Sequence, residues 1–119
     1  MINFLMDEHV PPLYRAQLLR REQSLTVWRI GDEGALPKGT PDPVLLCWCE
    51  ENDFVLITNN RKTMPRHLAD HLAAGRHVPG ILILNLDAPI GLALDDLILI
   101  ATASQPQEFL DRIAYVPLS

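Results

Sequence analysis

Two adjacent carboxylates stand at the end of the first apolar run of this sequence. Phe4-Leu5-Met6 leads directly into Asp7, Glu8 and His9. In parallel α/β sheets, ligands bind outside the carboxyl ends of the strands. Carboxylates placed there can hold a cation or polarise a water. Magnesium and manganese prefer such oxygen ligands, and Mg²⁺ often takes only one or two carboxylates while keeping several waters. The sequence therefore predicts an oxygen-ligand metal site that begins at Asp7 and includes Glu8.

Two later segments supply further oxygen atoms. Asp42 opens a predicted helix, and Asn60 follows the third predicted strand. Strand-end loops of one parallel sheet can bring these side chains to Asp7, where a bound cation would activate water and neutralise a phosphodiester. Two of the acids also have plainer interpretations. Asp42 suits a helix N-cap with Pro43 in the first turn, and Glu8 suits a solvated or salt-bridged surface position.

Apolar runs that alternate with helix-like segments predict an α/β protein with a mainly parallel sheet, in one domain that spans residues 1–119. The unbroken first run predicts a central strand. The predicted strands are Ile2–Met6, Leu25–Trp28, Phe54–Ile57, Ile81–Leu86 and Ile113–Val116, the last at a sheet edge. The predicted helices begin at Pro11-Pro12, at Asp42-Pro43 and at Pro65, and a fourth spans Leu92–Ala103. The longest loop is Gly31–Pro43.

Several familiar α/β sites are excluded by their missing motifs. No Gly-x-Gly-x-x-Gly follows a strand, and no P-loop is present. A phosphoacceptor receiver would need an aspartate after its third strand, where this chain has Thr58-Asn59-Asn60. The net charge of −5 argues against a general electrostatic grip on nucleic acid, because phosphate binding needs clustered Lys and Arg. Oxygen-ligand metal chemistry remains.

The sequence predicts a cytoplasmic protein. A strand-like run follows Met1 directly, which is unlike a signal peptide, and no apolar run reaches the roughly 18 residues of a membrane span. Cys47 and Cys49 are separated only by Trp48, which is too close for an ordinary disulfide, so buried reduced thiols are expected.

Three segments carry a resemblance to a known family: Leu5-Met6-Asp7-Glu8-His9-Val10-Pro11, then Pro41-Asp42 opening a helix, then Val55-Leu56-Ile57-Thr58-Asn59-Asn60-Arg61. Over residues 2–86 the chain resembles the short PIN-like proteins, bacterial relatives of the PIN nuclease domain and of the Mut7-C family. The resemblance implies a three-layer α/β/α fold, Mg²⁺ or Mn²⁺, and RNA cleavage by metal-activated water. Some members look like toxins of toxin–antitoxin pairs, which implies an antitoxin-like protein partner.

The resemblance also assigns residues. Asp7 and Asp42 match the acid positions of the family, and Thr58 and His9 lie in the matched segments. Asn60 stands where the family has an aspartate, and Lys62 where a second acid often follows. Losing that carboxylate weakens the attraction for a cation.

Three interpretations therefore compete, and whether the chain is an enzyme stays open. The first is a metal-dependent endoribonuclease of PIN type. The second is a PIN-like module that binds RNA or a protein without cutting. The third is a structural or regulatory subunit, with the apolar Leu92–Ala103 helix as a homodimer interface.

A basic strip begins beside the predicted site. Arg61, Lys62 and Arg66 are its first members and are predicted to contact RNA phosphates. A solvated helix face is the alternative interpretation. The full strip is Arg61, Lys62, Arg66, His67, His71, Arg76 and His77. The spacing of His67 and His71 can bind zinc, but no third ligand accompanies them, so surface histidines or phosphate contacts are favoured.

Overall fold

Five parallel strands form the centre of the structure, a computed structural model that describes residues 1–118. The strands are β1 (Phe4–Met6), β2 (Val27–Arg29), β3 (Val55–Thr58), β4 (Ile81–Leu84) and β5 (Ile113–Val116). The helices are α1 (Pro12–Arg21), α2 (Asp42–Asn52), α3 (Met64–Ala73) and α4 (Ile90–Ala103), and a short 3₁₀ helix, η1, covers Pro106–Phe109. Strands and helices alternate along the chain, which confirms the α/β class.

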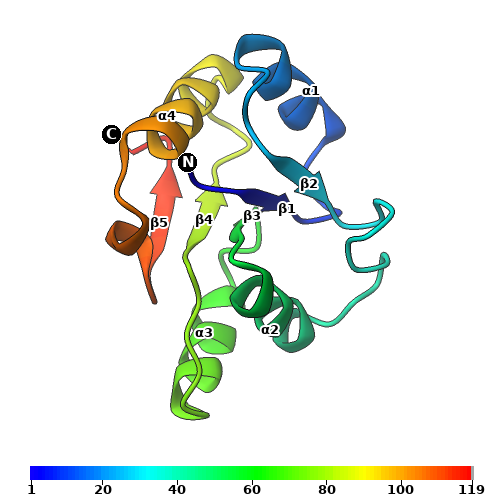
Figure 1. Ribbon diagram of the computed structural model, residues 1–119, viewed down its shortest axis with the longest axis vertical. Helices are drawn as coiled ribbons and strands as arrows, with labels where there is room; N and C mark the ends of the chain where they lie inside the picture. The colour runs from blue at the N-terminus through cyan, green and yellow to red at the C-terminus, as the bar shows by residue number, and fades with distance from the viewer. Residues whose placement is uncertain (119) are drawn as a thin grey trace.

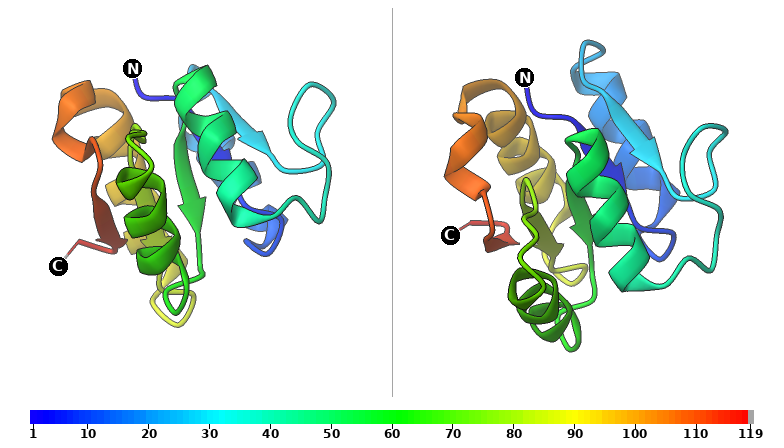
Figure 2. Two further views of the ribbon diagram at one scale, coloured as in Figure 1. Left: turned by 90° about the horizontal axis from the view of Figure 1, so that it is seen from below. Right: turned by 60° about the horizontal axis from the view of Figure 1, so that its bottom comes forward.

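The helices cover the sheet on both faces. α1 and α4 pack together on one face, and α2 and α3 pack together on the other (Figure 1). Figure 2 shows α2 and α3 (green) in front of the sheet and the other two helices behind it. Successive strand residues point to opposite faces, so Phe4 and Met6 join the core under α1 and α4, while Leu5 joins the core under α2. Both faces are buried, which explains why the first strand is apolar throughout and confirms the three-layer arrangement.

The strand order creates a switch point between β1 and β3. The order across the sheet is β2-β1-β3-β4-β5. The chain first extends the sheet from β1 to β2, then crosses back and extends it in the other direction through β3, β4 and β5. In doubly wound sheets of this order, ligands bind at the carboxyl ends of the two strands where the direction reverses. β1 is an interior strand, as expected, although the middle position belongs to β3.

The predicted elements are all present, with shifted boundaries. β3 ends at Thr58 rather than at residue 57, so the hydroxyl of Thr58 belongs to the strand end. β4 ends at Leu84 because a turn follows, in which the Asp87 N–H donates to Asn85 Oδ1 at 3.0 Å. β5 is an edge strand, which confirms that prediction. Cys47 and Cys49 are free thiols, and burial raises the pKa of Cys49 to about 12.

Most of the apolar surface of α4 is buried inside the domain. Its core side chains include Leu94, Leu97 and Ile100, whereas Leu92 and Leu99 are exposed. The structure thus accounts for the apolar character of this helix by burial against the sheet and α1. Among the described residues, no helix combines the length and the apolar character needed to cross a membrane.

The approaches to β4 and β5 are held together by one charged pair. The His77 imidazole contacts Asp111 Oδ2 at 2.7 Å, and the Val78 N–H donates to Asp111 Oδ1 at 2.9 Å. The hydrogen bond from His77 to the Asp111 carboxylate raises the pKa of His77 above its ordinary value. The pair therefore links stability to pH.

We expect His77→Gln to remove a pH-dependent part of the stability. An unfolded histidine has a pKa of about 6.5, and the folded value is higher. The contribution is therefore complete below about pH 6.5 and is lost as the pH rises through the folded pKa. Melting temperatures should show a larger deficit of the variant at pH 6 than at pH 9. His9→Gln, at an exposed position, is the matched control. Equal deficits of His77→Gln at both pH values would contradict the expectation.

Candidate functional site

Asp7 extends the pairing of β1 with β3 by one residue. The parallel register places Met6 opposite Ile57, and the Asp7 N–H donates to the Ile57 carbonyl at 2.9 Å. The next residue of β3 is Thr58, whose hydroxyl donates to Asp7 Oδ2 at 2.9 Å. Asp7 is only 7% exposed and Thr58 is fully buried. The strand ends at the switch point thus hold a nearly buried carboxylate in a fixed position.

A chain of hydrogen bonds connects Asp7 with Asp42. The Thr58 hydroxyl, which donates to Asp7, accepts from the Asn60 backbone N–H at 3.2 Å. The Asn60 side-chain amide then donates to Asp42 Oδ2 at 3.2 Å. His67 Nε2 lies 3.4 Å from the same oxygen. The structure therefore gathers four of the residues singled out from the sequence and adds His67, which the sequence placed only in the basic strip. We call these five residues the acid site.

Asn60 presents its amide nitrogen, not its oxygen, to Asp42. Its Oδ1 accepts from the Thr63 N–H at 3.2 Å, and its Nδ2 also donates to Thr63 Oγ1 at 2.6 Å. Asparagine commonly organises turns by such local bonds. Asn60 therefore orders the start of α3 and at the same time neutralises part of the field of Asp42. This orientation differs from the expected neutral oxygen ligand.

The Asp42 carboxylate is not used as a helix cap. The N-cap of α2 is Pro41, and Asp42 is the first helical residue. The Pro41 carbonyl accepts from the N–H groups of Val44 and Leu45, each at 3.0 Å. The N-cap interpretation of Asp42 is thus wrong by one position. Its carboxylate is free to face the acid site, where the positive end of the α2 dipole favours a negative charge.

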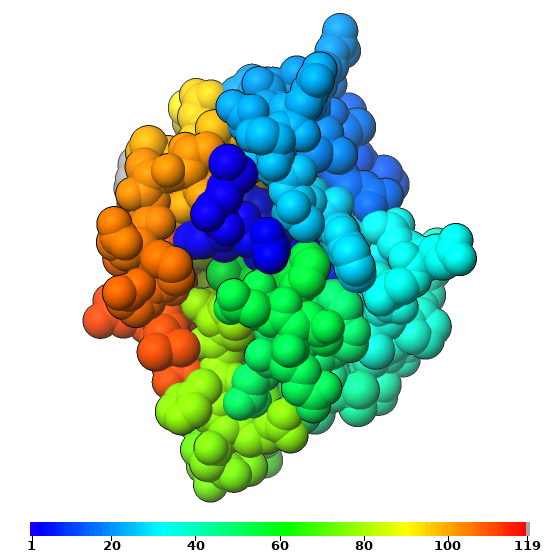
Figure 3. Space-filling view, in the orientation of Figure 1, coloured from blue at the N-terminus to red at the C-terminus, as the bar shows by residue number. Residues whose placement is uncertain are grey.

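Glu8 and His9 lie outside this hydrogen-bond chain. Glu8 Oε1 accepts from the Gly39 N–H at 2.7 Å and so fastens the long loop between β2 and α2. Figure 3 shows that loop (cyan) standing out from the surface beside α2. The Arg29 guanidinium donates to the Glu8 and Val10 carbonyls and stiffens the same turn. His9 is exposed. Glu8 therefore has a structural contact that explains it without a metal.

The basic strip separates into two groups. Arg61, Lys62 and Arg66 are exposed around the start of α3, next to the acid site. Beyond them, His71 Nε2 lies 3.1 Å from Glu50 Oε1, and the Arg76 Nε–H donates to the same oxygen at 2.9 Å. Only the first group is available to phosphates near the acid site.

The two histidines of the strip do not share a partner. His67 faces Asp42, whereas buried His71 faces Glu50 and the His77 carbonyl. The side-chain partners of the two histidines, Asp42 and Glu50, stand at opposite ends of α2, so the two rings serve different contacts.

The acid site carries a charge that its neighbours leave uncompensated. Among residues 1–118, no Lys, Arg or His lies within ion-pair distance of the Asp7 carboxylate. Burying an unpaired carboxylate is costly, and a bound cation would offset that cost. Within the described part of the chain, no three His, Cys, Asp or Glu side chains converge as a metal-binding group. The donor types present, carboxylate oxygens, are those that Mg²⁺ and Mn²⁺ prefer, and Mg²⁺ often takes only one or two carboxylates from a protein while keeping water as its other ligands.

Comparisons of the chain with protein-family models, with curated proteins and with solved structures find no match in any of the three. The fold and the acid site therefore define the chain only as an α/β protein with carboxylates at the switch point of its sheet.

We expect Asn60→Asp to make the protein dependent on Mn²⁺ for stability. The new carboxylate would face Asp42 where the amide now donates, so repulsion should lower the melting temperature in EDTA. Mn²⁺ should restore the melting temperature, because a cation between the two carboxylates replaces repulsion by attraction. Thermal melts with and without the metal measure both effects.

Asn60→Ala is the matched control for this variant. It also removes the bond to the Thr63 N–H, and a hydrogen bond of this kind is worth about 1 kcal/mol. The drop in melting temperature of Asn60→Ala relative to the wild type should be the same with and without Mn²⁺. Equal Mn²⁺ effects on Asn60→Asp and Asn60→Ala would place residue 60 away from any metal.

Proposed function

We propose that this chain is a PIN-like domain that binds single-stranded RNA at the carboxyl edge of its sheet and cleaves it with Mg²⁺ or Mn²⁺. The observation that carries the proposal is the nearly buried Asp7 carboxylate, which lies at the switch point without a cationic partner among the described residues. A protein that keeps such a charge gains most when a cation binds there. The resemblance to PIN-like proteins supplies the reaction class.

Asp7 and Asp42 would hold the metal. When bound, the metal supplies an activated water and neutralises charge on the phosphodiester. The Thr58 hydroxyl fixes the orientation of Asp7, and the Asn60 amide fixes that of Asp42. His67 lies against Asp42 and completes the wall of the site on the α3 side.

Arg61, Lys62 and Arg66 would attract the RNA backbone. They are exposed beside a site that is otherwise acidic, so phosphates would approach along α3. This local positive group compensates for the net charge of −5, which by itself disfavours nucleic acid.

Asp7→Asn should abolish Mn²⁺ binding and any cleavage of single-stranded RNA while leaving the protein folded. The amide keeps the size of the side chain but removes the buried charge, so the apo protein should be as stable as the wild type or more stable. Calorimetric titration with Mn²⁺, a gel assay of RNA cleavage and a thermal melt measure the three properties. Asp70→Asn, on the exposed side of α3, is the control and should change none of them. Unchanged Mn²⁺ affinity in Asp7→Asn would overturn the metal site.

A second candidate function is RNA binding without cleavage. One observation favours it: the residue that faces Asp42 is an amide donor rather than a third carboxylate. The acid site then contains fewer anionic ligands than the resemblance implies. The assay of RNA cleavage with Mn²⁺ separates the two candidates. A module that only binds RNA would do so in EDTA and would show no cleavage when Mn²⁺ is added.

The double variant Arg61→Ala, Arg66→Ala should lower RNA affinity and flatten its dependence on salt. For single strands, log K falls with log salt by about 0.7 for each phosphate contact, so losing two contacts should reduce the slope by about 1.4. Fluorescence anisotropy at several salt concentrations measures the slope. Arg20→Ala, exposed on α1, should leave it unchanged. An unaltered slope in the double variant would mean that this part of α3 is only a solvated face.

The proposal also includes a cytoplasmic location and a role as the toxin of a toxin–antitoxin pair. A cytoplasmic location agrees with two free thiols, because oxidising compartments favour disulfides. A toxin role with an antitoxin-like partner rests on the resemblance alone.

A homodimer through Leu92–Ala103 would have to use Leu92 and Leu99, which are exposed. These two residues flank the exposed Asp95, which is paired with Arg21.

A further inference from the structure

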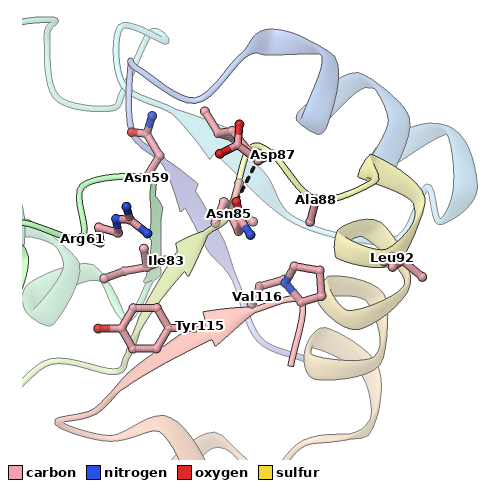
Figure 4. A pocket seen from close by; sticks show the side chains of 12 residues that line it. Asn59, Arg61, Ile83, Asn85, Asp87, Ala88, Leu92, Tyr115 and Val116 are labelled. Atoms are coloured by element: carbon pink, nitrogen blue, oxygen red, sulfur yellow. Dashed lines mark hydrogen bonds between the residues drawn. The ribbon is translucent and has the colours of Figure 1, made fainter. Parts of the chain in front are cut away.

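A cleft of about 520 Å³ lies at the carboxyl edge of the sheet, next to the acid site. It is formed by the segments that follow β3 and β4 and by the end of β5 (Figure 4). Its volume falls in the range of about 300–1,000 Å³ that is usual for ligand sites. The polar side chains in its lining are Asn59, Arg61, Asn85, Asp87 and Tyr115.

Successive side chains of the loop after β3 alternate between the acid site and the cleft. Thr58 and Asn60 belong to the hydrogen-bond chain of the acid site. Asn59 and Arg61, which alternate with them, line the cleft. In Figure 4, Arg61 lies between Asn59 and Tyr115, and Asn85 lies across from these three beside Asp87. A ligand bound at the acid site therefore has the cleft as its immediate neighbour, one residue away along the chain.

The chemistry of the cleft does not suit a phosphate. The lining contains one cation, Arg61, and one anion, Asp87, so these two groups together give it no net charge. The remaining polar groups are the neutral amides of Asn59 and Asn85 and the hydroxyl of Tyr115. The Asn85 oxygen already accepts from the Asp87 N–H, which leaves its NH₂ group as a donor (Figure 4). Donors and acceptors spread around a neutral lining match the edge of a nucleobase.

Tyr115 adds an aromatic surface. Its side chain is 55% exposed although it lies in a strand, because β5 is the edge of the sheet. Leu86 and Leu92 provide apolar contacts elsewhere in the lining. Proteins that bind single-stranded nucleic acid stack bases on such aromatic rings beside a basic group that meets the backbone. Arg61, between the cleft and the acid site, is that basic group.

We infer that the cleft binds a nucleobase, stacked on Tyr115, of the nucleotide adjacent to the phosphate at the acid site. The inference deepens the proposed function and rests on it for the position of that phosphate. It assigns the substrate class as a strand with at least one unpaired base. A base inside a duplex would be stacked and paired and would not reach the ring of Tyr115.

The experiment titrates the full chain with AMP, GMP, CMP and UMP in EDTA, with ribose 5-phosphate as the probe that lacks a base. Nuclear magnetic resonance should show shifts at Tyr115, Asn59 and Asn85 with at least one nucleotide and none with the sugar phosphate. Tyr115→Ala should weaken that binding about 5- to 140-fold, the equivalent of about 1–3 kcal/mol for a stacked base. Tyr115→Phe keeps the ring and should bind within about twofold of the wild type. Thermal melts establish that both variants fold.

The outcomes separate this inference from the proposed function. Equal shifts with ribose 5-phosphate, or equal affinity of Tyr115→Ala and the wild type, would overturn the base site even if Asp7→Asn abolished cleavage. Base-dependent binding that Tyr115→Ala removes would support the cleft even if no variant ever cleaved RNA. No shift with any of the four nucleotides would also overturn it.

Discussion

The parallel pairing of β1 with β3 is the contact on which the rest of the site depends. Every residue of both strands is buried. A slip of one residue would turn each core side chain to the opposite face of the sheet, so the register is strongly fixed. That register sets Asp7 beside Thr58. Hydrophobic packing therefore determines where the backbone of Asp7 lies, and the Thr58 hydroxyl then orients its carboxylate.

The surroundings of Asp7 and Asp42 differ in how strongly they favour a negative charge. The Asp7 carboxyl group is nearly buried and has a single hydroxyl donor from a neighbouring side chain. Asp42 is better compensated, because the Asn60 amide, His67 and the dipole of α2 all act on it. The two carboxylates are thus unequal. Under the proposed function, a cation would gain most at Asp7 and would enter from the more exposed side of the site, near Asp42.

Much of this arrangement could be predicted from the sequence, because it follows from strand ends. Apolar runs locate β1 and β3, and the polar residues after them must meet at one edge of a parallel sheet. Side-chain partners that lie far apart in the chain could not be predicted in this way. The bond of Glu8 to Gly39, the orientation of the Asn60 amide and the partner of His67 all depend on how loops pack. Local spacing carries no information about that packing.

The four residues from Thr58 to Arg61 divide their side chains by odd and even position. Even-numbered residues belong to the acid site, and odd-numbered residues belong to the cleft. Deleting Asn59 or Asn60 would move Arg61 into the position that faces Asp42 and Lys62 into the position of Arg61 in the cleft, so the acid site and the cleft would change together. Related chains should therefore vary in this run by substitution and not by length. Substitutions at the even-numbered positions would change the acid site, and substitutions at the odd-numbered positions would change the cleft.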